Sequence, residues 1–131
     1  MADLIELIEE RLSEDGQILN LRALFIREVG ARKLAQCELL GNLRALELSH
    51  NDIGDDGAKA IAESTSFPKL RTLNLKSNKI TDKGAEYLAN SDNLKNLKSL
   101  QLVVNDITEV GEKLLINSTK LTSLTSLKFR V

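Results

Sequence analysis

The amino-acid sequence predicts an α/β fold in which one short unit of strand, turn and helix recurs along the chain. Two observations lead to this prediction. Leucine supplies 25 of the 131 residues, whereas the chain has no Trp, one Tyr and three Phe. Leucines also recur at a fixed step, since Leu46, Leu73, Leu100 and Leu127 are each 27 residues apart. A repeated core position of constant size favours one aliphatic side chain, so the repeat explains the composition.

Further positions keep the same 27-residue step. They comprise two more apolar columns before the strand, an asparagine column after it, an isoleucine column in the turn, and a glycine and an aliphatic column in the helix. These columns are Leu43, Leu70, Leu97 and Leu124; Leu40, Phe67, Leu94 and Leu121; Asn51, Asn78 and Asn105; Ile53, Ile80 and Ile107; Gly57, Gly84 and Gly111; and Ile61, Leu88 and Leu115.

The first segment, residues 1–17, is predicted to be an acidic capping helix. Leu4, Leu7, Ile8 and Leu12 follow helical spacing. Residues 1–20 contain six acidic residues and one basic residue, a local charge of −5, whereas the other 17 bases and 13 acids give +4. Acidic residues at this end also argue against a secretory signal peptide.

Residues 18–39 are predicted to be a divergent first repeat. Leu24 and Ile26 match the paired strand leucines of the later units, and Gly30 matches the start of the helix. This alignment predicts a strand over residues 23–27 and a unit of 22 residues, five fewer than the others. A divergent unit at the end of a repeat array is expected.

Three full repeats are predicted at residues 40–66, 67–93 and 94–120. Leu46 and Leu48 flank polar Glu47, the alternation of a strand with one buried face. The asparagine after each strand is suited to hydrogen-bond neighbouring backbone groups. Asp55 and Asp82 precede the helical positions and are predicted to be helix N-caps.

Residues 121–131 are predicted to form a last strand, with Leu124, Leu127 and Phe129 at the strand positions. A strand at this edge exposes unpaired backbone that favours pairing with another chain. We expect either that the chain is a piece of a longer protein or that a partner, including a second copy, covers this edge.

The blocks Leu43–Ala62 and Leu70–Ala89 resemble the ribonuclease-inhibitor-like class of leucine-rich-repeat proteins. The Gly-Ala start of each helix also resembles that of bacterial repeat effectors. The resemblance extends from Leu21 to Val131. It implies a right-handed solenoid with parallel strands on the concave face and helices on the convex face. It implies no particular partner, because the shared residues build the scaffold.

The amino-acid composition argues against several classes of protein and of functional site. No stretch reaches the ~20 apolar residues of a membrane span, and a net charge of −1 with few aromatic residues does not indicate a nucleic-acid binder. One Cys (Cys37) cannot form an internal disulfide, and one His (His50) cannot build a multi-histidine metal site. We therefore expect no cofactor, no metal and a cytoplasmic location, which would be the host cytosol for a bacterial effector.

Other motifs favour structural interpretations. Asp52, Asp55 and Asp56 crowd one turn but lack the spacing of a calcium loop. His50 has no nucleophile placed near it by a motif, and Cys37 is predicted to fill a small apolar space in the first repeat. The glycosylation pattern at residues 117–119 is expected to be coincidental.

A partner is expected on the concave face, where side chains between the core leucines are not dictated by the fold. Several are basic, with Phe25 and the valine pair 103–104 as apolar anchors. The candidate partner-binding residues are Phe25, Arg27, Glu47, Ser49, His50, Thr72, Asn74, Lys76, Gln101, Val103, Lys128 and Arg130.

The sequence thus predicts a non-enzymatic protein-interaction module. Its partner would be a protein or peptide, and the basic residues suggest an acidic one. Two alternatives remain open: a substrate-recognition segment of a larger effector or enzyme, and a regulator of a small GTPase.

Overall fold

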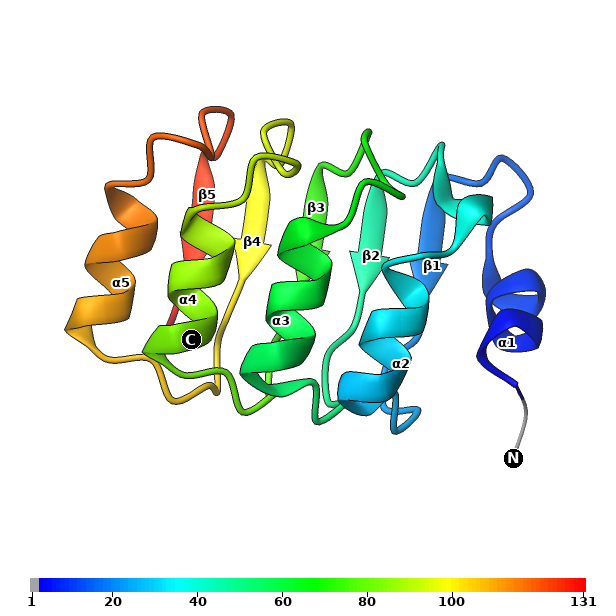
Figure 1. Ribbon diagram of the computed structural model, residues 1–131, viewed down its shortest axis with the longest axis horizontal. Coiled ribbons are helices and arrows are strands. Elements are labelled where there is room, and N and C mark those ends of the chain that lie inside the picture. The colour runs from blue at the N-terminus through cyan, green and yellow to red at the C-terminus, as the bar shows by residue number, and fades with distance from the viewer. Residues whose placement is uncertain (1–2) are drawn as a thin grey trace.

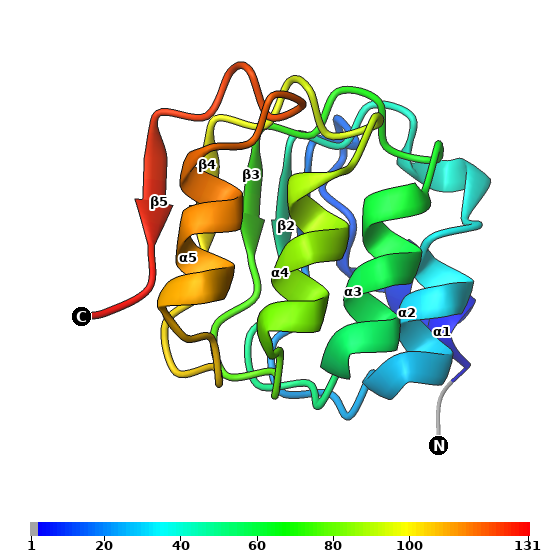
Figure 2. The ribbon, with the colours of Figure 1, turned by 60° about the vertical axis from the view of Figure 1, so that its left-hand side comes forward.

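Strands and helices alternate along the chain in a computed structural model that describes residues 3–131. Over these residues a sheet of five parallel strands lies in chain order, and helices α2–α5 cover one side of it (Figures 1 and 2). The elements are α1 (Leu4–Arg11), β1 (Ile18–Asn20), α2 (Arg27–Leu34), the 3-10 helix η1 (Glu38–Leu40), β2 (Ala45–Glu47), α3 (Gly54–Glu63), β3 (Thr72–Asn74), α4 (Asp82–Ala89), β4 (Ser99–Gln101), α5 (Glu109–Ile116) and β5 (Ser126–Lys128).

The α/β solenoid predicted from the sequence is confirmed, and the sheet register follows the 27-residue step. Leu46, Leu73, Leu100 and Leu127 are aligned across neighbouring strands. Each of helices α2–α5 packs against the next, while α1 contacts both α2 and β1 at one end (Figure 1).

The predicted strand over residues 23–27 is wrong. The first strand is Ile18–Asn20, in which Leu19 pairs with Leu46. The 27-residue step therefore extends to the first repeat, with Leu19 and Leu21 in place of Leu24 and Ile26. Residues 23, 25 and 27 have positive φ angles of 54°, 53° and 59°, which belong to a turn and not to a strand.

The core is a continuous aliphatic layer between the sheet and the helices. The leucines of the strand columns are almost completely buried in β1–β4, and the helices contribute Ile61 and Leu88. Phe67 is 1% exposed and is the largest of the fully buried side chains. Cys37 lies between α2 and η1 and is also buried, so it fills apolar space as predicted but outside the helix itself.

The asparagine column connects each repeat to the one before it. Asn78 Oδ1 accepts hydrogen bonds from the backbone N–H groups of Asn51 (2.9 Å) and Ile53 (3.3 Å), and its Nδ2 donates to Leu48 O at 2.9 Å. Asn51 makes the corresponding bonds to the first repeat. Because Asn78 is fully buried, its bonds satisfy backbone groups that water cannot reach.

Asp55 and Asp82 do not cap their own helices, contrary to the prediction. Thr81 and Thr108 are the N-caps of α4 and α5. Asp55 instead reaches from α3 to the next repeat, where its carboxylate accepts from Thr81 N at 2.7 Å, Thr81 Oγ1 at 2.6 Å and Gly84 N at 3.0 Å. Asp82 makes the same contacts with α5, and we call each such contact an Asp staple.

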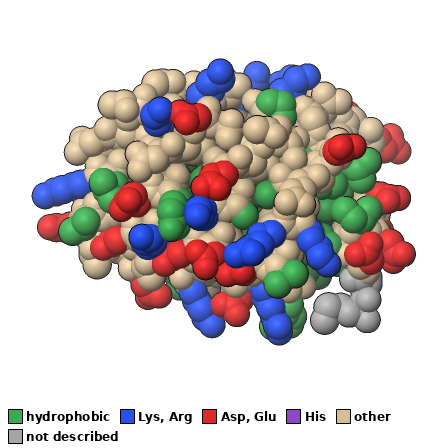
Figure 3. Space-filling model, viewed as in Figure 1, with side chains coloured by type: hydrophobic (Ala, Val, Ile, Leu, Met, Phe, Trp, Pro, Cys, Tyr) green, Lys and Arg blue, Asp and Glu red, His purple; other side chains and the backbone are tan. Residues whose placement is uncertain are grey.

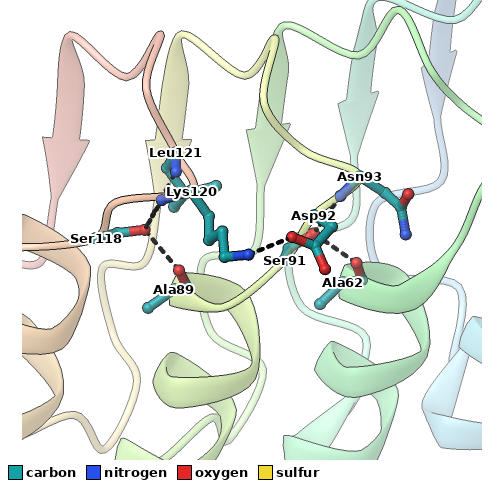
Figure 4. A network of polar contacts seen from close by, with 8 residues as sticks. All are labelled: Ala62, Ala89, Ser91, Asp92, Asn93, Ser118, Lys120 and Leu121. Atoms are coloured by element: carbon teal, nitrogen blue, oxygen red, sulfur yellow. Dashed lines mark hydrogen bonds and ion pairs between the residues drawn. The ribbon is translucent and has the colours of Figure 1, made fainter.

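A serine column, which the sequence analysis missed, connects the carboxyl ends of neighbouring helices. Ser91 Oγ donates to Ala62 O, and Ser118 Oγ donates to Ala89 O, both at 2.5 Å (Figure 4). Ser64 makes the same bond to Ala35 O. These serines are 27 residues apart, and Cys37 occupies the corresponding position of the first repeat. The hydroxyl of Ser118 is thus part of the scaffold.

No helix among the described residues has the length and apolar character needed to cross a membrane. Within the same residues, no group of three or more His, Cys, Asp or Glu side chains is arranged to hold a metal ion.

Candidate partner-binding face

The candidate site is the sheet face turned away from helices α2–α5, here called the open sheet face. It corresponds to the concave face predicted from the sequence. Each strand is short and points alternate side chains away from the core, so parallel register aligns them into columns. The first column contains Ile18, Ala45, Thr72, Ser99 and Ser126.

Ile18 differs from the other members of this column. Its side chain is 57% exposed, whereas the other members are small or polar. The strand predicted over residues 23–27 would have placed Ala23 here, so Ile18 was not among the predicted residues of this face. The signal that finds it is the 27-residue step from Ala45 back to residue 18.

The second column is Asn20, Glu47, Asn74, Gln101 and Lys128. Its polar side chains also close the ends of their own strands. Glu47 Oε1 accepts from Ser49 N at 2.7 Å, and Asn74 Oδ1 accepts from Lys76 N at 3.0 Å. Asn74 Nδ2 also donates to Glu47 Oε2 at 2.9 Å. These bonds fix the Glu47 and Asn74 side chains at the centre of the face, since each accepts a hydrogen bond from the backbone.

The third column follows the strands at the same 27-residue step and contains both buried and accessible positions. Its members are Arg22, Ser49, Lys76, Val103 and Arg130. Ser49 is 1% exposed and Val103 is 5% exposed, so neither presents a side chain to a partner. Among the described residues, Ser49 Oγ and Gln101 Oε1 are buried without a hydrogen-bond partner. Lys76 is half-buried, and Arg22, which the sequence analysis missed, is exposed.

Arg130, at the end of this column, points its side chain toward α5. Its guanidinium group lies 2.5 Å from Glu112 Oε2 on α5, in an ion pair that joins β5 to the helical layer. Arg130 is therefore paired within the domain, although its side chain remains 72% exposed.

His50 follows β2, is exposed as expected, and has a φ of 58°. The same left-handed conformation occurs 27 residues later at Ser77 and again at Val104. Val104 is 61% exposed and β-branched, a residue type that rarely adopts positive φ. The valine pair thus has one buried member, Val103, and one exposed member.

Phe25 and Arg27 do not lie on the open sheet face. Phe25 lies in the turn that leads into α2 and Arg27 is the first residue of α2, and the Arg27 guanidinium group lies 5.8 Å from the centre of the Phe25 ring. Their alternate spacing resembles a strand because every second residue of this turn has positive φ. The exposed candidates that remain on the open sheet face are Thr72 and Lys128, with Glu47, Asn74, Lys76 and Gln101 half-buried beside them.

Comparison with known proteins supports the same repeat unit. A family model described as a leucine-rich repeat matches residues 42–62 and 68–89, which contain the second and third strands with their helices. This match supports a leucine-rich-repeat protein. No curated protein matches the chain.

Leucine-rich repeats are generally protein-interaction modules. The matched segments supply β2, β3, α3 and α4, the centre of both the core and the open sheet face. The match identifies the scaffold, whereas recognition depends on the residues between the scaffold positions.

Proposed function

We propose that this leucine-rich-repeat protein is a non-enzymatic module that binds a protein or peptide on its open sheet face. The observation that carries the proposal is the alignment of outward side chains on five parallel strands. Among the described residues, no helix covers that side of the sheet (Figures 1 and 2). A preformed surface of this kind loses little conformational entropy when it binds.

The size of the face limits what it can hold. Neighbouring strands lie about 4.8 Å apart, so five strands extend about 20 Å from the first to the last. Each strand has only three residues. An extended peptide or a single helix fits these dimensions better than a large protein surface does.

Charge on the face favours a partner with carboxylate groups. Lys128 is exposed and Lys76 is half-buried, and neither forms an ion pair within the described part of the chain. The carboxylate of Glu47 is already bonded to Asn74 and to the backbone. We therefore propose that the two lysines meet acidic residues of the partner, while Thr72 and Ser99 provide a flat surface between them.

A charge-reversal experiment tests this function. The double variant Lys76→Glu/Lys128→Glu should lose capture of partners from a lysate of the source cells, quantified by mass spectrometry, while its melting temperature stays within a few degrees of the parent. The matched control is Lys95→Glu/Lys98→Glu, which changes the net charge equally in the loop before β4, where both residues are exposed. Equal capture by the parent and both variants would contradict the proposed face.

Two finer assignments belong with this proposal. A 27-residue unit with a full helix in every repeat supports the ribonuclease-inhibitor-like class, and the Gly-Ala helix starts support similarity to bacterial repeat effectors. Cys37, the one Cys of the sequence, is buried and has no second Cys in the chain to pair with, which supports a cytoplasmic location. Fractionation of source cells, with antibody detection of the chain, tests the location.

Self-association is a further proposal for the edge strand β5. Leu124, Leu127 and Phe129 are half-buried there, although the corresponding leucines of β2–β4 are almost fully buried. A second copy that covers this edge would complete their burial. Sedimentation equilibrium over a concentration series measures it, and a single monomeric mass at all concentrations would contradict it.

A further inference from the structure

A second surface lies at the opposite end of the solenoid from β5. A groove of about 380 Å³ is lined by Leu4 and Leu7 of α1, by Phe25 of the turn before α2, and by Arg27, Val29 and Lys33 of α2. We call it the N-terminal groove. Hydrophobic side chains gather over this end of the molecule, close to the labelled positions of α1 and α2 (Figure 3).

The apolar character of this groove is not required by the fold. Phe25 and Val29 are 70% and 61% exposed. The next repeat has Asp52 and Asp56 at the corresponding positions, and the third repeat has Lys79 and Lys83. The fourth repeat has Asp106 and exposed Val110 at these positions, so an exposed valine recurs there, whereas the aromatic ring of Phe25 is a local feature of the first repeat. Since the later repeats fold with charged residues at the position of Phe25, the repeat itself does not require an apolar side chain there.

The backbone of the turn supports this interpretation. Phe25 and Arg27 both have positive φ, a conformation that is unfavourable for residues with a bulky side chain. The second repeat has Asp52 and Gly54 at these positions, and both residue types tolerate positive φ more readily. The first repeat therefore keeps an exposed aromatic ring and a guanidinium group despite the conformational cost.

Charge at the groove indicates the chemistry of its occupant. Arg27 and Lys33 are exposed, and neither forms an ion pair with a carboxylate in the described chain. Asp3 is the one acidic residue among those that line the groove. The lining thus carries two positive charges and one negative charge beside an apolar floor.

We propose that the N-terminal groove binds a peptide segment of a partner protein that places a carboxylate beside one or two large apolar side chains. The apolar side chains would pack between Phe25, Val29 and the leucines of α1, and the carboxylate would pair with Arg27 or Lys33. A volume of about 380 Å³ suits a few side chains and not a folded domain. This surface is separate from the open sheet face, so it gives the module a second point of attachment.

Two synthetic 12-residue peptides test the proposal. Both contain the same leucine and phenylalanine residues, but one carries glutamates and the other carries lysines at the remaining positions. In ¹H–¹⁵N spectra the acidic peptide should shift signals of α1, the turn and α2, and the basic peptide should bind at least about tenfold more weakly. No binding of the acidic peptide, equal binding of both peptides, or shifts centred on the open sheet face would overturn the proposal.

The variant Phe25→Lys/Val29→Lys copies the third repeat and separates apolar anchoring from charge. It adds positive charge, so electrostatic attraction alone would strengthen binding of the acidic peptide. We expect at least about tenfold weaker binding because the apolar contacts are lost. The control is Val110→Lys, which makes the Val29→Lys change at the equivalent, 64% exposed position of α5. It should alter the affinity less than about twofold.

Unchanged binding by Phe25→Lys/Val29→Lys, or an equal loss in Val110→Lys, would overturn the proposal. Circular dichroism confirms that each variant is folded. The open-face variant Lys76→Glu/Lys128→Glu should bind the acidic peptide as the parent does. If the parent forms a dimer and Phe25→Lys/Val29→Lys does not, the groove binds a second copy of the chain. That result would overturn the proposal of a partner peptide.

Discussion

The boundary between α2 and α3 and the boundary between α3 and α4 share two side-chain connections and differ in a third. Both have an asparagine that bonds to the preceding repeat and a serine that donates to the preceding helix, through Asn51 and Ser64 in one case and Asn78 and Ser91 in the other. Only the α3–α4 boundary has an Asp staple, from Asp55.

Two residue changes explain the missing staple. At the position of Asp55, the first repeat has Glu28, which pairs with Arg32 of its own helix at 3.0 Å. At the position of the N-cap Thr81, the second repeat has Gly54, which has no hydroxyl to donate. A constant step of 27 residues therefore does not give every pair of neighbouring repeats the same side-chain bonds. Each Asp staple needs an aspartate in one repeat and a threonine N-cap in the next.

Replacing the shared asparagine should have the largest effect. Asn78→Ala removes a fully buried amide, leaves the backbone N–H groups of Asn51 and Ile53 without partners and removes one of the two bonds to Leu48 O. We expect the free energy of unfolding to fall by about 2–4 kcal/mol, because buried unpaired polar groups each cost about 1–3 kcal/mol. Urea denaturation measures the loss. A loss below about 1 kcal/mol would show that the asparagine column is not a main connection between repeats.

The glycine at the helix start should distinguish the two boundaries. A Cβ atom added at Gly84 would lie 2.6 Å from Asp55 Oδ1, whereas at Gly57 the neighbouring helix presents the Ala31 Cβ at 3.3 Å. Gly84→Ala should therefore destabilise by about 2 kcal/mol through displacement of the staple.

Gly57→Ala is the matched comparison and should cost less in the same denaturation experiment, since each glycine also lies close to the isoleucine that precedes its own helix. A larger loss in Gly57→Ala than in Gly84→Ala would mean that the isoleucine contact, and not the staple, governs both positions.

Ser91→Cys should make the α3–α4 boundary resemble the first repeat, where Cys37 occupies the serine position. The thiol is a poor donor, so the bond to Ala62 O is weakened and the free energy of unfolding should fall by about 1 kcal/mol. Thermal denaturation of this variant beside Ser118→Cys gives the measurement. Stability equal to that of the parent would show that the helix ends need no such bond.

The smallest effect concerns acid pH and the staple from Asp82. The hydrogen bond from the Thr108 hydroxyl lowers the pKa of the Asp82 carboxyl below its ordinary value, and the Thr108 and Gly111 N–H groups act in the same direction. A carboxylate with a lowered pKa stabilises the fold above its unfolded-state pKa of about 4, and that contribution is lost as the pH falls through the folded value.

Asp82→Asn should therefore show a weaker loss of melting temperature between about pH 6 and pH 3 than the parent. Glu109→Gln, at the same helix position one repeat later, is the control and should keep the parent's pH dependence. Parallel pH profiles for the parent and Asp82→Asn would argue against the staple's electrostatic role.

The repeated positions made most of the fold predictable from the sequence. Leu46 and its equivalents established the strands, and the asparagine column established the connections, because both recur at a constant step. The first repeat was placed wrongly, since Leu24 and Ile26 imitate the strand leucines while Leu19 and Leu21 keep the true step. The candidate site was predicted less well: buried Ser49 and Val103, the pairing of Arg130 with Glu112, and the contribution of Ile18 all required the structure.

The sequence by itself determined the repeat length, the leucine-based core and the class of solenoid, because local periodicity and residue size specify them. Tertiary structure alone decided which repeats share an Asp staple and which polar residues of the sheet remain accessible. It also decided where Phe25 and Val29 lie, in a groove beside α1 and away from the sheet. The physical reason is that these properties depend on contacts between residues from adjacent repeats, about 27 positions apart, and on backbone angles in the turns between them.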